Sequence, residues 1–301
     1  MVLAGGSGLI GRALAAELVR AGVEVVVLSR SEPGSGLPAG VRVVRWDGRT
    51  AAGWAAECDG AEAVVNLAGE NVASGRWTAA RKRRLESSRI EPTRAVVEAI
   101  GAARVPPRAL LQGSAVGYYG DGGEAGLDDW APRGEGFLPE LSERWEQASQ
   151  PVEALGVRRV LLRTGIVLAR EGGALAKMML PFRLGLGGPL GSGRQWFPWI
   201  HLDDEVGAIR FLLERRELSG AFNLVAPEAT TQRGFARALG RALRRPAVAA
   251  VPAPLLRLAV GEMATVLLAS QFVIPARLVE AGFTFAQPEL DGALDALVGR
   301  R

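Results

Sequence analysis

The first eleven residues carry the pattern with the clearest chemistry. A short apolar stretch, residues 1–4, runs into glycines at positions 5, 8 and 11, and a helical pattern of apolar residues follows. Glycine lets the backbone turn tightly and approach phosphate groups, and a helix N-terminus offers free N–H groups to an anion. The order strand, glycine turn, helix therefore predicts a site for a dinucleotide pyrophosphate. The residues that we expect to contact it are Gly5, Ser7, Gly8, Leu9, Ile10 and Gly11.

The end of the second apolar stretch distinguishes between the two nicotinamide dinucleotides. A fold that binds NAD usually has an acidic residue about 20 positions beyond the glycines, which holds the ribose 2′-hydroxyl. This chain instead has Arg30 between Ser29 and Ser31. A guanidinium suits a 2′-phosphate because its fork can hold two phosphate oxygens. We therefore predict NADP(H) as the cofactor, bound in part by Ser29 and Arg30; an exposed arginine at a strand end is the alternative interpretation.

We expect further cofactor contacts where the third and fourth strands end. Trp46 and Asp47 would flank the adenine, and the Asp47 carboxylate would accept a hydrogen bond from its amino group. The run Asn-Leu-Ala-Gly at residues 66–69 has small residues that would let a cofactor lie close to the backbone. The other predicted contacts here are Leu67, Ala68, Gly69, Glu70 and Arg89.

Strand and helix patterns alternate along the first two thirds of the chain. Apolar stretches that predict buried strands lie at residues 1–4, 24–28, 42–46, 63–67, 109–112, 159–163 and 221–224. Helical patterns lie at residues 9–21, 76–88, 92–102, 141–155 and 204–214. This order predicts an α/β fold with a Rossmann-type, doubly wound parallel sheet, whose ligands bind at the carboxyl ends of the strands.

Two glycine-rich segments and the tail interrupt this alternation. Residues 120–136 and 185–199 lack any period and predict long loops, which in a compact domain are usually functional. We predict an NADP-binding Rossmann domain over residues 1–240 and a small, mostly helical C-terminal domain over residues 246–301.

The second of these loops is the candidate wall of a substrate site. Its side chains could stack on a ring or bind a charged group, so we expect the segment at residues 180–200 to contribute to the C-terminal cap. Packing beneath the cap is the alternative role of the tryptophans. The predicted substrate contacts are Arg194, Gln195, Trp196 and Trp199.

The composition narrows the class of protein. The 301 residues are 48% hydrophobic and 23% charged, as in ordinary globular proteins. Cys58 is the single cysteine and His201 the single histidine, which excludes an intrachain disulfide and a Cys/His metal cluster. We therefore predict no metal.

Apolar runs and charged runs in the sequence also predict where the protein is located and which partners it has. No apolar run approaches the ~20 residues of a membrane span, and residues 1–4 are too short for a signal-peptide core. These features predict a cytoplasmic protein with no membrane partner. The net charge is +4, and the basic run at residues 81–84 is interpreted as a solvated helix face balanced by Glu86 and Glu91. We therefore predict no nucleic-acid partner.

Several stretches resemble the extended short-chain dehydrogenase/reductases. They are the glycine turn, residues 66–69 and residues 114–121 (Ser-Ala-Val-Gly-Tyr-Tyr-Gly-Asp). More narrowly, the chain resembles the atypical epimerase family subgroup that has its own C-terminal domain. That closer resemblance rests on residues 66–71 with 76–77, 163–168, 187–195 continuing to 199–204, and 270–278 with 281–283. It implies a Rossmann-type fold, NADP binding, and oxidoreductase or sugar-nucleotide epimerase activity on a small-molecule substrate; a homodimer is left open.

The chain departs from this wider family at the catalytic residues. The family's usual Tyr and Lys, four residues apart on one helix, align with Leu138 and Ser142, so the dyad is absent. The resemblance makes Ser114 the catalytic hydroxyl, with Tyr118 and Tyr119 as further candidates. Tyr118 is preferred, because Tyr119 matches a structural position of the family. A neutral phenol can still donate a hydrogen bond to a carbonyl oxygen during its reduction.

The leading function is NADP-dependent hydride transfer to a small carbonyl-type or sugar-nucleotide-like substrate. The absent dyad favours an alternative, an NADP(H)-binding sensor or partner-binding module without turnover. A sugar-nucleotide epimerase is a third possibility, but no competent base is visible. A hydrolase built on Ser114, His201 and Asp203 is disfavoured because Gly-X-Ser-X-Gly is missing, and we expect Asp203 or Asp204 to cap a helix instead.

Overall fold

A parallel sheet of seven strands forms the centre of the computed structural model, which describes residues 1–30 and 36–298. The strand order is β10-β7-β5-β4-β1-β2-β3, and each pair of neighbours is parallel. From β1 the sheet grows first to one side, through β2 and β3, and then to the other, through β4, β5, β7 and β10. This change of side at β1 confirms the predicted doubly wound, Rossmann-type fold. The strands are β1 (Val2–Ala4), β2 (Val25–Ser29), β3 (Val41–Arg45), β4 (Ala63–Asn66), β5 (Ala109–Ala115), β7 (Arg158–Thr164) and β10 (Gly220–Leu224).

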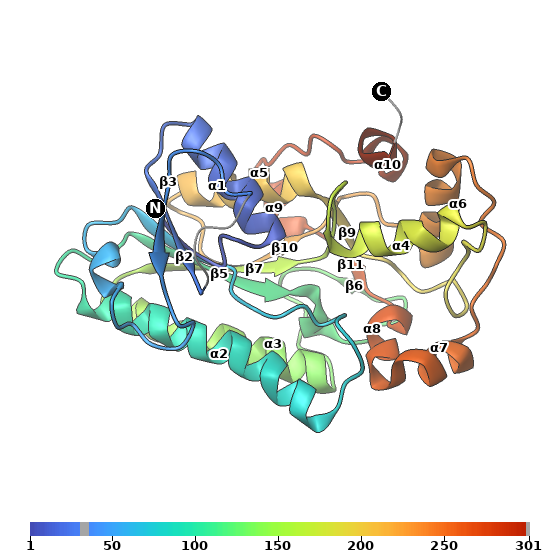
Figure 1. Cartoon of the computed structure of the whole chain (residues 1–301), viewed down its shortest axis with the longest axis horizontal. Helices are drawn as coiled ribbons and strands as arrows, with labels where there is room; N and C mark the ends of the chain where they lie inside the picture. The colour runs from blue at the N-terminus through green and yellow to red at the C-terminus, as the bar shows by residue number, and fades with distance from the viewer. Residues whose placement is uncertain (31–35, 299–301) are drawn as a thin grey trace.

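Helices cover both faces of this sheet, which explains why its inner strands are apolar without alternation. On one face lie α1 (Leu9–Arg20) and α5 (Leu202–Glu214), and on the other α2 (Ala79–Ala102) and α3 (Phe137–Ala148) (Figure 1). Each face has its own core: Leu14 and Leu111 are buried on the α1 side, and Val64 and Ile100 on the α2 side.

Two predicted helix boundaries are wrong. Residues 79–102 form one helix, because Pro92 is accommodated inside α2, which Thr78 caps by accepting a hydrogen bond from the Arg81 N–H. The helix predicted over residues 141–155 is interrupted instead. The first part, α3, ends at Ala148, and a 3-10 helix occupies Gln150–Leu155, since Pro151 lacks the N–H that a longer helix needs.

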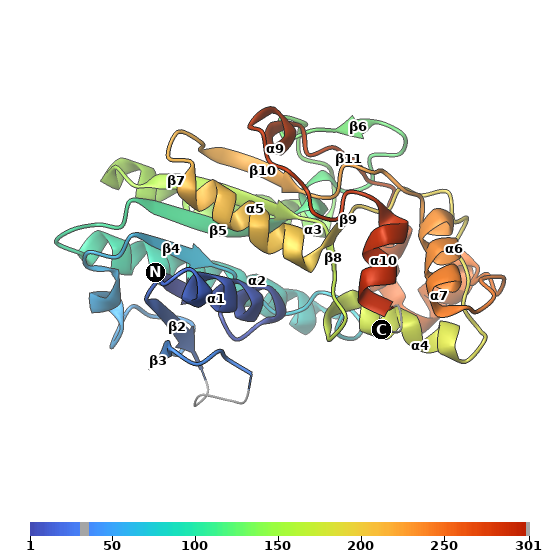
Figure 2. The same cartoon turned by 90° about the horizontal axis from the view of Figure 1, so that it is seen from above.

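A group of helices lies beyond the carboxyl ends of the strands (Figure 2). It comprises α4 (Gly173–Arg183), α6 (Gln232–Leu243), α7 (Ala253–Val260), α8 (Ala264–Leu268) and α10 (Leu290–Val298). The tail is tied to earlier segments: β11 (Phe272–Val273) pairs with β6 (Gly126–Leu127), and α9 (Ala276–Glu280) packs beside β10. Another short pair joins β8 (Ile166–Leu168) to β9 (Trp199–His201). The division into domains at residues 240–246 stays a prediction.

Within residues 1–30 and 36–298, no helix is long and apolar enough to cross a membrane. The same part of the chain has no group of three or more His, Cys, Asp or Glu residues that could hold a metal ion. Cys58 is fully buried, and burial raises the pKa of its thiol to about 12. A buried neutral thiol is a poor nucleophile, which agrees with the absence of an activating pattern around it.

Candidate functional site

The glycine turn after β1 is packed so closely that two of its positions require glycine. Gly5 has a φ of +78°, and a Cβ there would lie 2.6 Å from the carbonyl carbon of Leu67 and 2.8 Å from the Ala68 nitrogen. A Cβ on Gly11 would lie 2.5 Å from the Gly5 carbonyl oxygen. The turn is therefore pressed against the end of β4, the arrangement that brings a helix N-terminus to the sheet edge.

The start of α1 has the properties of an anion site. Gly8 is the N-cap residue, and no side chain of residues 1–30 and 36–298 caps the first N–H groups of the helix. Ser7 and Gly8 are exposed, while Leu9 and Ile10 are half-buried. Free N–H groups and the positive end of the helix dipole together favour a phosphate. The residues present thus fit the pyrophosphate of a dinucleotide.

Arg30 lies where the sequence predicts a group for a 2′-phosphate. It is exposed, follows β2 directly, and its Cδ lies 3.4 Å from where a Cβ of Gly48 would be. Its guanidinium has no hydrogen-bond or ion-pair partner among the described residues. Arg12, to which the sequence analysis assigned no role, follows Gly11 directly and is exposed, and its Nη1 lies 3.5 Å from the Cβ position of Gly36. Ser31 lies outside the described residues.

The predicted adenine contacts at the end of β3 are in part wrong. Trp46 is buried, donates from Nε1 to the Thr50 carbonyl oxygen at 2.8 Å, and packs on Trp54, so it belongs to the core. The Asp47 carboxylate accepts hydrogen bonds from the backbone N–H groups of Thr50 and Arg49 and from the Thr50 hydroxyl. These bonds lower the pKa of Asp47. Its carboxylate stabilises this turn, and a contact with adenine stays a prediction.

Arg89 packs against the segment that follows β4, residues 67–70, and hydrogen-bonds its backbone. Arg89 is buried and donates from Nη2 to the Glu70 carbonyl oxygen at 2.9 Å, while its Cζ lies 3.3 Å from the Cβ position of Gly69. Burial lowers the pKa of Arg89 to about 10. Arg81 is also buried and pairs with the Glu70 carboxylate. Part of the basic run at residues 81–84 is therefore internal rather than a solvated face.

Ser114, at the end of β5, belongs to a buried network of charged groups. Its Oγ donates to Glu146 Oε1 at 2.6 Å. Glu146, on α3, is held in turn by Arg163 of β7 through Nε at 2.9 Å and Nη2 at 3.1 Å. A carboxylate in such a pair can only accept, so the single hydroxyl proton of Ser114 is directed to Glu146. The lone pairs of Ser114 Oγ remain for another group.

The hydroxyl groups of Tyr118 and Tyr119 differ in their hydrogen-bond partners. The hydroxyl of Tyr119 lies 2.7 Å from Asn223 Oδ1 and 2.9 Å from the Asp128 carbonyl oxygen, and it accepts from Arg163 at 3.0 Å. Burial raises the pKa of Tyr119 to about 12, which fits a structural role. The ring of Tyr118 lies 3.6 Å from the Arg163 guanidinium, and its hydroxyl has no partner within the described chain. Catalysis by either tyrosine stays a prediction.

The predicted substrate wall is largely packed inside the protein. Gln195 is buried and donates to the carbonyl oxygens of Leu190 and Leu267. Trp199 is 1% exposed and belongs to a hydrophobic core, which agrees with the alternative role of packing beneath the cap. Contact of either residue with a substrate stays a prediction.

Two residues of the loop remain accessible. Arg194 is exposed, and Trp196 is half-buried, stacked on Phe272 at 4.7 Å with its Nε1 donating to Glu124. Their contact with a substrate stays a prediction.

The segment around His201 is structural. His201 itself is the N-cap of α5, because its Nδ1 accepts from the Asp203 backbone N–H at 3.1 Å. The prediction that Asp203 or Asp204 caps this helix is therefore wrong. Asp204 instead accepts from the backbone N–H groups of Ala286 and Gln287 and so anchors the C-terminal tail.

Glu205 gives the structure a pH-dependent stability. It is fully buried, hydrogen-bonds Thr164 through Oε1, and has no partner for Oε2 in the described chain. Burial raises the pKa of Glu205 from its ordinary 4.5 to about 8. Between these values the folded state keeps a proton that the unfolded state has lost. The free energy of unfolding is therefore expected to fall by several kcal/mol as pH rises from 4.5 to about 8.

Denaturant unfolding of Glu205→Gln across this pH range checks the assignment. The variant is expected to lack the decline and to exceed the parent in stability at pH 8. Glu280→Gln, at an exposed position, serves as the control and should keep the decline. If the free energy of unfolding fell equally with pH in the parent and in Glu205→Gln, the buried carboxyl group would not be the source of the decline.

The fold and the glycine turn define a dinucleotide-binding protein of the short-chain dehydrogenase/reductase type. A model of the NAD dependent epimerase/dehydratase family matches residues 1–135, and a domain of unknown function (DUF1731) matches residues 251–297. The chain is 41% identical to epimerase family protein SDR39U1 of Bos taurus, over 99% of both chains. It is 40% identical to epimerase family protein MT2273 of Mycobacterium tuberculosis, over 98% of this chain and 96% of that protein.

A solved structure extends the comparison to three dimensions. The crystal structure of human epimerase family protein SDR39U1 (isoform 2) with NADPH superimposes with a TM-score of 0.90 at 38% identity, covering 100% of this chain and 99% of that one. This chain belongs to the epimerase family of short-chain dehydrogenase/reductase-like proteins that includes SDR39U1.

Proposed function

We propose that this protein is an NADP(H)-dependent oxidoreductase that transfers hydride to a small carbonyl-type or sugar-nucleotide-like substrate. The observation that carries the proposal is the start of α1, which no side chain of the described residues caps, together with the Arg30 guanidinium, which has no partner among those residues, at the ends of the neighbouring parallel strands β1 and β2. One group suits a pyrophosphate and the other a 2′-phosphate. The NADPH in the structure of the human relative supports the same cofactor for this chain.

Each part of the cofactor site has its own task in this proposal. The glycine turn would bind the pyrophosphate, Arg30 the 2′-phosphate, and the backbone of residues 67–70 would line the cofactor, supported by Arg89. When bound, NADP(H) supplies or accepts the hydride. A cytoplasmic location is a further prediction from the sequence alone, and a homodimer stays open.

Ser114 and Glu146 would move the proton that accompanies the hydride. In the oxidative direction, Ser114 Oγ accepts the proton of a substrate hydroxyl while its own proton passes to Glu146 Oε1, 2.6 Å away. In the reductive direction Glu146 must first take up a proton from solvent; the two transfers then run backwards, from Glu146 to Ser114 and from Ser114 to the carbonyl oxygen. This relay would replace the absent Tyr and Lys, and Arg163 keeps the Glu146 carboxylate in position.

A binding module without turnover is the second candidate. Two observations favour it: the Tyr119 hydroxyl is enclosed by three partners, and the Ser114 proton is engaged with Glu146. A sugar-nucleotide epimerase would have to retain its nicotinamide cofactor and return the hydride to the opposite face of a keto intermediate, and no observation among the described residues favours that step.

Turnover with NADPH separates these candidates. We expect the purified chain to oxidise NADPH with at least one compound of a panel of ketones, aldehydes and 4-keto sugar nucleotides. Ser114→Ala should slow that reaction on the order of a hundredfold or more, and Ser219→Ala, at an exposed serine, should leave it unchanged. NADPH binding without oxidation by any compound would favour the binding module.

A further inference from the structure

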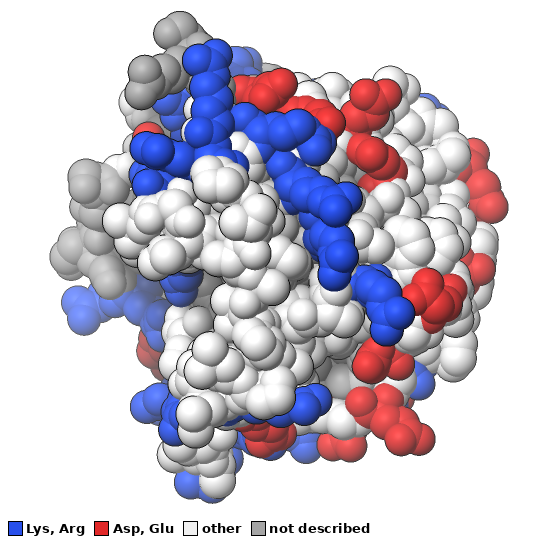
Figure 3. Space-filling model, turned by 90° about the vertical axis from the view of Figure 1, so that its right-hand side faces the viewer, with Lys and Arg blue, Asp and Glu red and all other residues white. Residues whose placement is uncertain are grey.

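The exposed side of α6 presents a row of arginines that the proposed function does not use. Arg233, Arg237, Arg241 and Arg244 follow one another at intervals of three or four residues, and Arg245 comes next. Such spacing places Arg233, Arg237 and Arg241 on one face of α6, and Arg244 and Arg245 follow the last residue of the helix. All five are exposed. Figure 3, viewed from the side where α6 lies, shows a row of basic side chains beside a broad uncharged area.

Most of this charge is uncompensated. Arg241 pairs with Asp291 at 2.6 Å, and Arg233 donates to the Ser192 carbonyl oxygen. The guanidinium groups of Arg237, Arg244 and Arg245 have no hydrogen-bond or ion-pair partner in the part of the chain that the structure describes. Like charges along one helix face repel, so folding stability does not explain the row.

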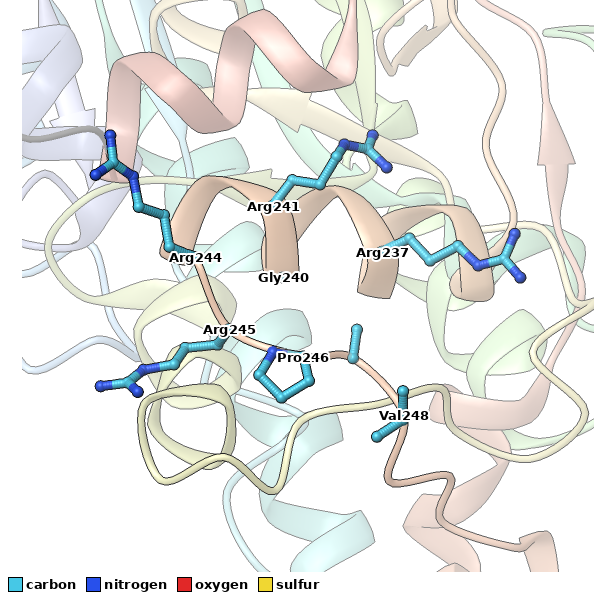
Figure 4. A pocket seen from close by; sticks show the side chains of 8 residues that line it. Arg237, Gly240, Arg241, Arg244, Arg245, Pro246 and Val248 are labelled. Carbon is cyan, nitrogen blue, oxygen red and sulfur yellow. The ribbon is translucent and has the colours of Figure 1, made fainter.

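These arginines surround a shallow hollow rather than fill a closed pocket. The hollow, of about 560 Å³, lies between α6 and the segment 245–248. Figure 4 shows the guanidinium groups of Arg237, Arg241, Arg244 and Arg245 fanning outward around it instead of converging on one point. A single small phosphate needs converging donors, whereas an extended anionic surface does not.

The backbone conformation at Arg244 is a second unusual feature of this surface, independent of the charge. Arg244 has a φ of 53° and is the only non-glycine residue with positive φ in the described chain. It follows directly on α6, where glycine avoids the steric penalty of the left-handed region. An arginine at this strained position lies at the rim of the hollow.

Exposed apolar side chains adjoin the row. Val248 is 81% exposed, Leu184 67% and Leu186 65%. They belong to two segments that lie side by side, because the Ala249 N–H donates to the Gly187 carbonyl oxygen at 3.0 Å. Isolated apolar residues are common on surfaces, but a cluster beside a basic row is not.

We propose that this face docks peripherally on an anionic lipid surface. A membrane interface offers phosphates in a plane, which the outward guanidinium groups can bind, and acyl chains behind them, into which Val248, Leu184 and Leu186 can insert. A soluble phosphate compound would use only the charges. The proposal departs from the sequence-based prediction that the protein has no membrane partner.

Vesicle flotation of the full chain tests this proposal. We expect binding to vesicles of phosphatidylcholine mixed with phosphatidylglycerol, little binding to phosphatidylcholine alone, and release at high salt. Changing Arg237, Arg244 and Arg245 together to Gln should weaken binding on the order of a hundredfold. Changing Val248 and Leu186 to Ser should weaken it on the order of tenfold or more with every charge retained.

A matched variant separates the row from net charge. Arg83, Arg84 and Arg94 are exposed on α2, and changing all three to Gln removes the same charge without touching the row. Equal losses in both triple variants would overturn the proposal. Retention on a polyglutamate or DNA column without vesicle binding, or full competition by free tripolyphosphate, would overturn it too.

Arg244→Gly distinguishes a docking role from a structural one. Glycine relieves the left-handed conformation, so the variant should be at least as stable to denaturant as the parent and yet bind anionic vesicles about fivefold less. Unchanged vesicle binding would count against Arg244 as a lipid contact and against the assignment of this rim.

Discussion

Replacing Glu146 by glutamine is expected to lower the free energy of unfolding by about 3–5 kcal/mol. Glu146 is 7% exposed and holds the guanidinium of Arg163 with both oxygens. Glutamine keeps the shape of the side chain but removes the charge that compensates a buried cation. Because an unpaired buried charge costs more than a lost hydrogen bond, the effect should exceed that of removing the Ser114 hydroxyl. Urea denaturation at constant pH measures the difference.

Two comparisons isolate this pair. Glu62→Gln breaks two exposed ion pairs, with Arg108 and Arg216, and its effect should stay within about 1 kcal/mol. Arg163→Met combined with Glu146→Leu removes both charges and should recover part of the stability that either change alone loses. A loss of under 1 kcal/mol for Glu146→Gln would mean that Arg163 does not depend on this carboxylate, and the proton relay proposed for Ser114 would lose its support.

Replacing Gly5 by alanine is expected to abolish measurable NADPH binding and to lower the free energy of unfolding by about 3 kcal/mol or more. The new methyl group would lie 2.6–2.8 Å from backbone atoms of Leu67 and Ala68, and backbone there cannot move without displacing the end of β4. The turn would open away from the strand, and its N–H groups would no longer point to one pyrophosphate.

Gly22→Ala is the matched control for this prediction. Gly22 has a φ of +77°, nearly that of Gly5, but a Cβ there meets nothing within 4 Å. It should therefore show only the conformational penalty of about 1 kcal/mol and bind NADPH normally. Fluorescence titration and denaturant unfolding of both variants provide the measurement. Equal behaviour of the two would show that the contact with β4 is unimportant.

Local patterns in the sequence predicted the sheet and the start of the cofactor site. Strand, glycine turn and helix follow one another within residues 1–20, so their chemistry could be read without knowing the fold. Arg30 was proposed in the same way, because the end of a strand is a local feature, and its contact with the cofactor stays a prediction. The contact of Trp46 with adenine was wrongly predicted. This residue follows β3, and its packing on Trp54 and its bond to Thr50 depend on how the next turn folds.

The buried network around Ser114 could not be assembled from local patterns. Ser114 and Glu146 are 32 residues apart, Glu146 and Arg163 are 17 apart, and the three groups come from β5, α3 and β7. One signal was present: an arginine within an apolar strand needs a buried acceptor, and Arg163 is such a residue. The pairing of Ser114 opposite Arg163 became known only with the strand register.

The packing of the loop at residues 185–199 was hard to predict for a different reason. Its glycines and tryptophans are typical of a ligand wall, but hydrogen bonds from its backbone to residues 249 and 251 fold it into the protein. Gln195 and Trp199 thereby become interior groups. Glu205 was missed because acidic residues are ordinary at the start of a helix, where they interact with the dipole, and nothing local shows that this one is buried.

Calorimetric titration of the purified chain with NADPH and NADH at low salt tests the central claim most directly. The account predicts that NADPH binds at least about tenfold more tightly than NADH, because Arg30 makes a charge-assisted bond to the 2′-phosphate. Arg30→Gln should remove that advantage and leave NADH binding unchanged. Equal or tighter binding of NADH, or no binding of either nucleotide, would contradict the account.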